Sequence, residues 1–194
     1  WCKMGGVLTL ISLVIDTATD RTSVALFHRN ELLFDGYHDG TTAHAEALPK
    51  LVSDALAVEK NINQVVVGMG PGPFTGLRVG IVFAQSFAQA RNIAWRGVCS
   101  LDGFDIDADE YIVTSDARRK EVYWAKYNKG ERTYGPQVST PDYVAELPEK
   151  KFGFGFGPTI YPSMALLLAK SQSSSVTQPI YLRRPDAVPT SERK

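Results

Sequence analysis

The sequence predicts an α/β fold in which helices cross over mixed sheets. Short apolar runs rich in β-branched residues alternate with longer segments whose apolar residues recur at helical spacing. Over residues 8–98 the predicted order is three strands, a helix, a strand, a helix and a strand, which is typical of a mixed sheet covered by helices. After residue 110, strands are expected at 111–115, 121–127 and 152–157, and helices at 140–147 and 160–170.

Composition and charge narrow the class of protein. The chain has 194 residues, enough for one or two domains, and its 21 basic residues balance 21 acidic ones. A neutral chain has no overall field for nucleic acid, so an RNA contact should be local or shared with a partner. Cys2 and Cys99 lack metal-type spacing and suit a cytoplasmic protein. The apolar run 7–15 is too short to span a membrane, and we interpret it as a first strand rather than a signal peptide.

The first three strands are predicted at 8–16, 22–27 and 31–37. The first is apolar for most of its length, as a central strand should be, and it ends in Asp16-Thr17-Ala18-Thr19. An acid followed by a Thr-rich turn resembles the start of the actin/Hsp70/sugar-kinase (ASKHA) fold, whose active members hold the acid near Mg²⁺ and the turn near phosphate. The resemblance makes Asp16, Thr17 and Thr19 a candidate vestigial nucleotide site. A carboxylate that only caps its own turn is an equally consistent interpretation.

The first helix is predicted over residues 43–60. It has a clear apolar stripe, formed by Leu48, Leu51, Val52, Ala55 and Leu56. Thr41 or Thr42 is the expected N-cap, and Pro49 should start or kink the helix. His44 has no second histidine one turn later, so we expect a capping or surface histidine rather than a metal ligand.

Residues 64–91 contain a strand, a Gly-Pro loop and a second helix. The strand is Val65–Val67, the loop is Gly70-Pro71-Gly72-Pro73, and helical spacing begins after Thr75. The loop lacks the lysine and the glycine spacing of a phosphate loop, and its prolines have no N–H group to offer an anion. We therefore expect a rigid structural turn rather than an ATP cradle.

Two faces of this second helix are apolar. Gly76, Gly80, Ala84 and Ala88 form a small-residue ridge, and a second row holds Val79, Phe83 and Phe87. A helix that is apolar most of the way round is either buried in one core or shared with a partner. Both interpretations remain open at this point.

The segment from Gly68 to Gly80, G-M-G-P-G-P-F-T-G-L-R-V-G, resembles the signature of the TsaB (YeaZ-type) family. That family is the accessory, dimerising subunit of the machinery that makes threonylcarbamoyladenosine in tRNA. Weaker resemblances lie at 42–49, 114–125 and 179–185. They imply an ASKHA-like fold with an N-terminal subdomain at 1–105, which carries the partner interface, and a shortened C-terminal subdomain at 106–194 with a flexible tail.

The segment after the strand at 93–98 bears on catalysis. In the catalytic sister family, TsaD, two histidines four residues apart hold a metal, and the matching positions here are Ser100 and Phe104. Phenylalanine has no donor atom and serine is a poor ligand for such a site. The resemblance therefore implies a non-catalytic subunit with no metal, no cofactor and no catalytic residue. It would bind and stabilise the threonylcarbamoyltransferase that modifies position 37 of tRNA.

The same resemblance supplies the expected partners. These are a TsaD-type catalytic subunit, a TsaE-type ATPase within the complex, a second copy of the chain when it is alone, and tRNA indirectly. The predicted interface comprises His44, Leu48, Leu51, Val52, Pro73, Phe74, Thr75, Gly76, Leu77, Arg78, Gly80, Phe83, Ala84 and Phe87.

Two alternative functions stand against this hypothesis, and the role of one basic segment stays open. The chain could be an ASKHA-type ATPase or phosphotransferase that uses Asp16. A metallopeptidase is rejected because His28, His38 and His44 offer no pair at helical spacing. The basic run Arg118–Lys120 is either a solvated turn or a contact for a partner or RNA.

Overall fold

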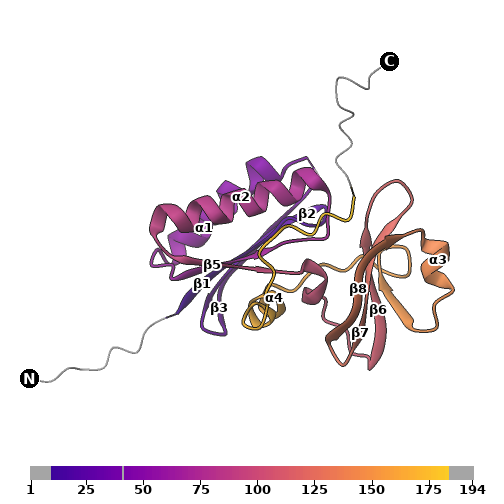
Figure 1. Ribbon diagram of the computed structural model, residues 1–194. Coiled ribbons are helices and arrows are strands. Elements are labelled where there is room, and N and C mark those ends of the chain that lie inside the picture. The colour runs from indigo at the N-terminus through magenta and orange to yellow at the C-terminus, as the bar shows by residue number, and fades with distance from the viewer. Residues whose placement is uncertain (1–9, 41, 184–194) are drawn as a thin grey trace, which may run out of the picture.

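The computed structural model describes residues 10–40 and 42–183, and they form two β-sheets with four α-helices (Figure 1). Predicted features at residues 8 and 9, at Thr41 and beyond residue 183 lie outside the described residues. No helix in the described part is both long and apolar enough to cross a membrane.

The first sheet contains five strands in the order β3-β2-β1-β4-β5. Its strands are β1 (Ile11–Asp16), β2 (Arg21–His28), β3 (Glu31–Asp39), β4 (Gln64–Gly68) and β5 (Ala94–Val98). The neighbours β1–β2 and β2–β3 are antiparallel, whereas β1–β4 and β4–β5 are parallel. With α1 (His44–Val58) between β3 and β4 and α2 (Phe74–Arg91) between β4 and β5, the predicted order of strands and helices is confirmed.

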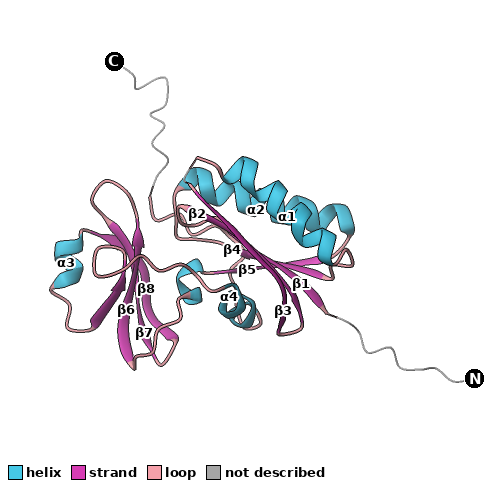
Figure 2. Cartoon of the chain, turned by 180° about the vertical axis from the view of Figure 1, so that it is seen from behind, coloured by secondary structure: helices cyan, strands magenta, loops and turns pink. Residues whose placement is uncertain are grey.

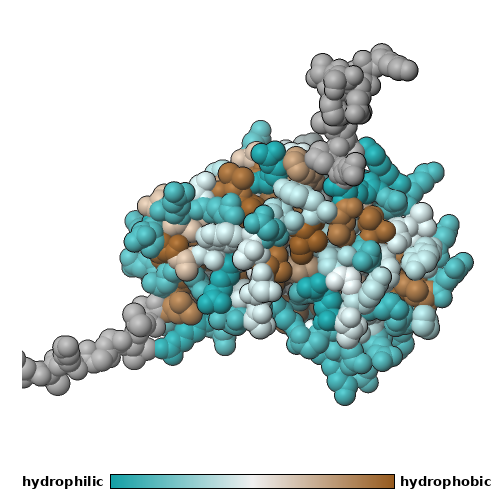
Figure 3. Space-filling model, viewed as in Figure 1, coloured by the Kyte–Doolittle hydropathy of each residue, from teal (hydrophilic) through white to brown (hydrophobic). Residues whose placement is uncertain are grey.

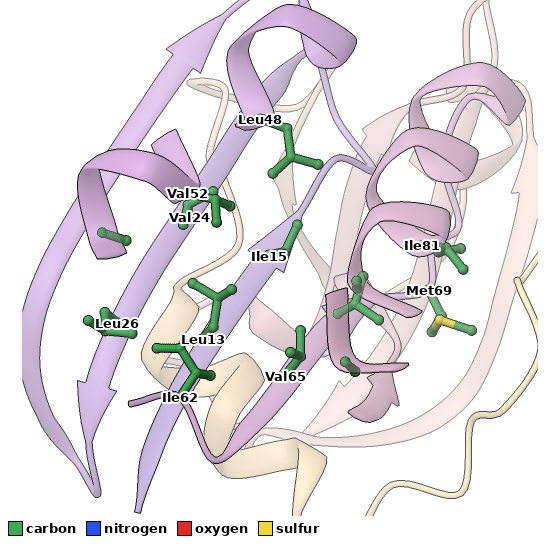
Figure 4. Packing of buried hydrophobic residues seen from close by; sticks show 14 of the residues in the cluster. Leu13, Ile15, Val24, Leu26, Leu48, Val52, Ile62, Val65, Met69 and Ile81 are labelled. Carbon is green, nitrogen blue, oxygen red and sulfur yellow. The ribbon is translucent and has the colours of Figure 1, made fainter. Parts of the chain in front are cut away.

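Helices cover both faces of this sheet. Alternate residues of a strand point to opposite faces, so β1 sends Leu13 and Ile15 towards α1 and α2, and Val14 to the other side. The core under α1 and α2 is the largest in the molecule's described part (Figure 4). On the opposite face lies α4 (Met164–Ser171), which packs Leu167 and Leu168 against the sheet (Figure 2).

The second sheet has four strands in the order β8-β7-β6-β9. They are β6 (Glu110–Asp116), β7 (Val122–Asn128), β8 (Glu131–Ser139) and β9 (Lys150–Gly153). Only β6–β9 is a parallel pair. One face of this sheet carries the short helix α3 (Pro141–Ala145), with Val144 packed on Trp124 and Ile112.

Two segments join the sheets. The 3₁₀ turn η1 (Ser100–Gly103) lies between α4 and the second sheet, and residues 176–183 run back from α4 across the molecule. We call residues 176–183 the C-terminal strap. It bridges Gly97 at Val176, and the Ile180 N–H donates to the Met69 carbonyl at 2.8 Å. The predicted subdomain boundary between residues 105 and 106 stays a prediction.

Several predicted boundaries were wrong. Helix α1 has Ala43 as its N-cap, with no side-chain cap, so Thr42 does not cap it, and Pro49 lies inside the helix. Helix α4 begins at Met164 rather than residue 160 because Pro162 and the Ser163 N-cap precede it. The strand expected over 152–157 ends at Gly153 and gives way to a turn. Strand β8 was not predicted.

Candidate functional site

Hydrogen bonds from η1 and from the second sheet hold the Gly-Pro loop before α2. The Gly70 N–H donates to the Ser100 hydroxyl at 3.2 Å, and the Ser100 N–H donates to the Gly70 carbonyl at 2.8 Å. From the second sheet, the Tyr123 hydroxyl lies 3.3 Å from the Gly72 carbonyl oxygen. A Cβ on Gly72 would come within 2.4 Å of the Ala18 carbonyl, so only glycine fits here. The loop is therefore a structural turn that sets the start of α2.

The small-residue ridge of α2 faces the chain's own core. A Cβ on Gly80 would lie 2.3 Å from Thr17 Oγ1, and one on Gly76 would lie 2.9 Å from the Thr17 carbonyl. Ala84 and Ala88 are fully buried under the same sheet. The ridge lets the helix approach the end of β1, because glycine leaves room for the Thr17 backbone. Gly76, Gly80 and Ala84, which the sequence analysis places in the partner interface, therefore face the chain's own core in this structure.

The predicted interface residues of α1 are also mostly internal. Leu48 and Val52 belong to the first core, as does Leu77 of α2, whereas Leu51 is half-buried. His44 is only 5% exposed, and its Nδ1 lies 2.8 Å from the Thr22 hydroxyl, so the expectation of a capping or surface histidine was wrong. Burial lowers the pKa of His44 below its ordinary value, which favours the neutral ring.

The other predicted residues lie on the outward side of α2. Thr75 and Arg78 are exposed, and Pro73, Phe74, Phe83 and Phe87 are half-buried. Together with three residues that the predicted interface left out, Val79, Val82 and Ser86, this side of α2 forms a shallow groove of about 580 Å³. The groove is lined by Phe74, Thr75, Arg78, Val79, Val82, Phe83 and Ser86. Figure 3 shows hydrophobic side chains among polar ones on the face where α2 lies in front.

We call this surface the α2 groove. Aromatic rings pack against each other and against arginine side chains along it. The rings of Phe83 and Phe87 stack at 6.1 Å, and the Arg91 guanidinium lies 4.6 Å from the Phe87 centroid. At the other end, Arg78 lies 5.2 Å from the Phe74 centroid. Val82, between the two ends, is 54% exposed. Its signal in the sequence was its position three residues after Val79, on the second apolar row.

The candidate nucleotide residues are engaged within the fold. Asp16 is 1% exposed; its Oδ2 accepts the Ser100 hydroxyl at 2.6 Å and its Oδ1 accepts the Ala18 N–H at 2.9 Å. Burial raises the pKa of Asp16 to about 6, against the lowering effect of these two bonds. Thr17 donates its hydroxyl to the Gly76 carbonyl at 2.8 Å. Asp16 therefore caps its own turn and also ties β1 to η1.

Thr19 lines the nearest cavity, which is too small for a nucleotide. The cavity lies between the Asp16 turn and the second sheet and holds only about 60 Å³. Pockets for cofactor-sized ligands usually measure several hundred cubic ångströms. Its walls include Asp20, Asp116 and Arg118. The described residues thus offer Asp16 no open phosphate site.

The two positions that match metal ligands serve the core. Ser100 is 1% exposed and donates to Asp16, and Phe104 is 4% exposed in the cluster that joins η1 to the second sheet. Among the described residues no group of three or more His, Cys, Asp or Glu side chains is arranged to hold a metal. Both side chains have taken up packing roles.

Comparison with known proteins identifies the family. The model of the TsaD family, tRNA N6-adenosine threonylcarbamoyltransferase, matches residues 39–165. The chain belongs to this family. Among the proteins that this family model covers, which include the catalytic TsaD type, the chain is of the TsaB (YeaZ) type. It is 36% identical to the Escherichia coli tRNA threonylcarbamoyladenosine biosynthesis protein TsaB over 138 residues, which is 61% of this chain and 55% of that protein.

Mycobacterial relatives match more of the chain. An uncharacterised Mycobacterium tuberculosis protein is 40% identical over 91% of this chain and 93% of its own length. An uncharacterised Mycobacterium leprae protein is 40% identical over 92% of this chain. The chain spans about half of the length of the M. leprae and E. coli relatives, 56% and 55%.

A solved structure shares the fold. The crystal structure of a Pseudomonas aeruginosa protein, described as uncharacterised with similarity to peptidase YEAZ, superposes with a TM-score of 0.72. It is 24% identical, and the match covers 90% of this chain and all of that one. The α/β architecture with two mixed sheets that was expected from the sequence is thereby confirmed.

Proposed function

We propose that the chain is a non-catalytic subunit that binds and stabilises the catalytic TsaD-type threonylcarbamoyltransferase during threonylcarbamoyladenosine formation at position 37 of tRNA. The TsaB-named relatives support a place in this biosynthesis. The observation that carries the binding role is the α2 groove, an exposed apolar surface on a helix whose other side is fully used by the core. Exposed apolar patches of this kind mark interaction sites.

The chemistry of the groove indicates the kind of partner surface. Val82 and the edges of Phe74 and Phe83 would contact an apolar helix, because such rows interdigitate with the side chains of a facing helix. Arg78 and Arg91 stand at the two ends of the row, over Phe74 and Phe87. A partner with carboxylates at the rim of its apolar patch would complement them.

A non-catalytic role is supported by the two positions that match the metal-binding histidines of the catalytic family. Ser100 and Phe104 stand where the catalytic sister family has metal-binding histidines, and both are committed to the core. The catalytic subunit would supply the transfer chemistry, and a TsaE-type ATPase would act within the same complex. The chain would meet tRNA in the cytoplasm through this assembly, and the α2 groove would hold a second copy of the chain when the catalytic subunit is absent.

The substitution Val82→Arg tests this proposal. Val82 is 54% exposed in the centre of the groove, so an arginine there should leave the fold intact but place a charge inside the interface. We expect the affinity for the catalytic subunit to fall at least about tenfold, since central interface residues dominate binding. Light scattering after size-exclusion chromatography, on the chain alone and mixed with the catalytic subunit, measures both assemblies.

Leu32→Arg is the matched control. Leu32 is 52% exposed on β3, but it lies beside Met164 on the face of the sheet that carries α4. It should leave both assemblies unchanged. A Val82→Arg chain that still binds the catalytic subunit as tightly as the wild type would refute the α2 groove as the interface. A wild-type chain that ignores the catalytic subunit would refute the accessory role itself.

A further inference from the structure

The turn between β6 and β7 presents basic side chains on an unusual backbone. Arg118, Arg119 and Lys120 all have left-handed φ angles, of 62°, 53° and 61°, and all three are exposed. Each such residue costs about 1–2 kcal/mol relative to a right-handed conformation. Non-glycine residues held in this way concentrate at functional positions.

Local bonds hold this turn in place. The Arg118 N–H donates to Asp116 Oδ1 at 2.7 Å, the Glu121 N–H donates to the Arg118 carbonyl at 3.0 Å, and the Ala117 N–H donates to the Glu121 carbonyl at 3.0 Å. Ala117 is buried, so the tip of the turn carries charged side chains and no apolar one. The basic groups are therefore displayed on a fixed frame rather than on a loose loop.

Further cations extend the patch towards α2. Arg183 of the C-terminal strap pairs with Glu121 and approaches the Arg118 carbonyl. Two residues earlier in the strap, Tyr181 is 40% exposed and packs its ring 5.0 Å from that of Phe74, over which Arg78 lies. We call Arg78, Arg118–Lys120 and Arg183 the basic patch. Its five cations outnumber the nearby carboxylates of Asp20, Asp116 and Glu121. Of these carboxylates, Asp116 pairs with Arg118 at 3.0 Å and Glu121 pairs with Arg183.

The balancing acidic charge lies at the other end of the second sheet. Asp105, Asp107, Asp109 and Glu110 come just before or at the start of β6, whereas the basic turn follows its end. A seven-residue strand spans roughly 20 Å, more than twice the screening length of physiological salt, which is about 8 Å. The zero net charge of the chain therefore hides two separate local fields.

We propose that the basic patch contacts the phosphate backbone of tRNA. This inference rests on the proposed function and deepens it, because it gives the chain a direct contact with the RNA. Phosphate contacts need cations and no apolar core, which matches the turn, whereas a protein interface needs an apolar centre. The exposed ring of Tyr181 beside the patch offers a face on which an unpaired base can stack. Arg78 belongs both to the basic patch and to the rim of the α2 groove, whereas the turn Arg118–Lys120 and Arg183 do not line the groove. The turn can therefore contact RNA while the groove holds a protein.

The double variant Arg118→Asn/Lys120→Asn tests the proposal. Asparagine tolerates the left-handed conformation, so the turn should keep its shape while it loses two charges. The probe is labelled unfractionated tRNA, titrated with the complex of this chain and the catalytic subunit between 50 and 200 mM salt. The slope of log affinity against log salt is negative, and two lost phosphate contacts should reduce its magnitude by about 1.4–1.8. Affinity near 150 mM salt should fall roughly tenfold to thirtyfold.

Arg29→Asn/Lys129→Asn is the matched control. Arg29 and Lys129 are also exposed and left-handed, with φ angles of 55° and 49°, but they lie in the β2–β3 and β7–β8 turns. This control loses the same net charge as the test variant, but at positions outside the basic patch. It should therefore leave both the slope and the affinity unchanged. Equal losses in the two double variants, or no loss in either, would overturn the proposal.

Two further measurements distinguish an RNA contact from an acidic protein partner, and a failure of this proposal from a failure of the proposed function. A poly-glutamate peptide that displaces tRNA as effectively as poly-uridylate of equal charge would point to an acidic protein partner and overturn the RNA contact. The variants at the turn should co-purify with the catalytic subunit like the wild type. If the wild type itself fails to co-purify, the proposed function fails, whereas the same titrations on the chain alone still decide on the basic patch.

Discussion

At the scale of single residues, Asp16 is the feature with the clearest energetic consequence. A carboxylate that is 1% exposed has lost its water, and two hydrogen bonds replace only part of that hydration. The pKa of Asp16 therefore rises from 3.8 to about 6. Because the folded protein holds this proton more tightly than the unfolded chain, the side chain destabilises the fold as pH rises from about 4 to 6. Above pH 6 the full cost remains.

Asp16→Asn should remove this pH dependence. The free energy of unfolding of the variant, relative to the wild type, should increase between pH 4 and pH 7 by up to about 3 kcal/mol. Urea unfolding at a series of pH values measures the difference. The absolute stability at one pH is less informative, since the new amide group faces two donors, from Ser100 and Ala18. A difference that stays constant with pH would contradict the raised pKa.

The sequence identified these polar residues and their local hydrogen bonds, but not their partners from distant parts of the chain. The Asp-Thr-Ala-Thr pattern offered the turn-capping role of Asp16 as one of two interpretations, because that bond is local. Its second partner, Ser100, is 84 residues away in the chain. His44 was misjudged for the same reason: its partner Thr22 belongs to another element, and nothing near His44 in the sequence announces the bond.

At the scale of elements, α2 shows how two apolar faces can have different roles. The small-residue ridge meets Thr17, and the row with Val82 meets solvent. The pattern alone predicted the helix and both faces but could not assign a face to the core. That assignment depends on where β1 ends relative to α2, which only the tertiary structure shows. A substitution at Gly80 tests it, because Gly80 lies against Thr17 at the end of β1.

Gly80→Ala should destabilise the protein although alanine favours helices. Intrinsic propensity alone would stabilise the helix by about 1 kcal/mol. The new Cβ would, however, lie 2.3 Å from Thr17 Oγ1, whose hydroxyl is held by the Gly76 carbonyl. We expect a net loss of about 1–3 kcal/mol in the free energy of unfolding, measured by urea denaturation.

A second substitution isolates the clash. Thr17→Ala removes the hydroxyl that the new methyl group meets, so the double variant should be more stable than the sum of the two single effects predicts. Ser86→Ala, on the exposed side of the same helix, should change stability little. A Gly80→Ala protein more stable than the wild type would show that α2 does not approach Thr17 this closely.

Strand β8 and helix α4 show where local patterns fail. Residues 131–139 contain Gly135-Pro136 and few apolar side chains, so nothing marks them as a strand. They become one because β7 offers an unpaired edge. In α4, apolar periodicity runs back to Ile160, but Pro162 and the Ser163 cap delay the helix. Strand pairing and helix capping decide these boundaries. Both depend on residues that lie outside the segment whose pattern is being read.

At the scale of the whole molecule, η1 is the joint between the two sheets. Asp102 accepts the Tyr127 hydroxyl at 2.9 Å and the Arg132 Nε at 2.8 Å, which ties η1 to β7 and β8. On its other side, the Gly103 carbonyl accepts the Ser163 N–H at the start of α4. Since α4 packs on the first sheet, this short turn carries the mechanical link between the halves. The basic patch and the α2 groove keep their relative positions only if the joint holds.

Asp102→Ala should uncouple the unfolding of the two sheets. The substitution leaves the Tyr127 hydroxyl and the Arg132 guanidinium without their carboxylate in a half-buried place, at a cost of about 1–2 kcal/mol. Trp124 is buried in the second sheet and Trp95 lies in β5 of the first, so fluorescence of variants that keep one tryptophan follows each half during urea unfolding. In the parent protein the two transitions should coincide. In Asp102→Ala the Trp124 transition should move to lower urea while that of Trp95 stays.

Glu131→Ala, which removes the exposed ion pair between β8 and Lys170 of α4, should leave the transitions together, because exposed pairs contribute little. If both transitions of Asp102→Ala shift equally, the halves unfold as one unit and the link must be shared with the C-terminal strap.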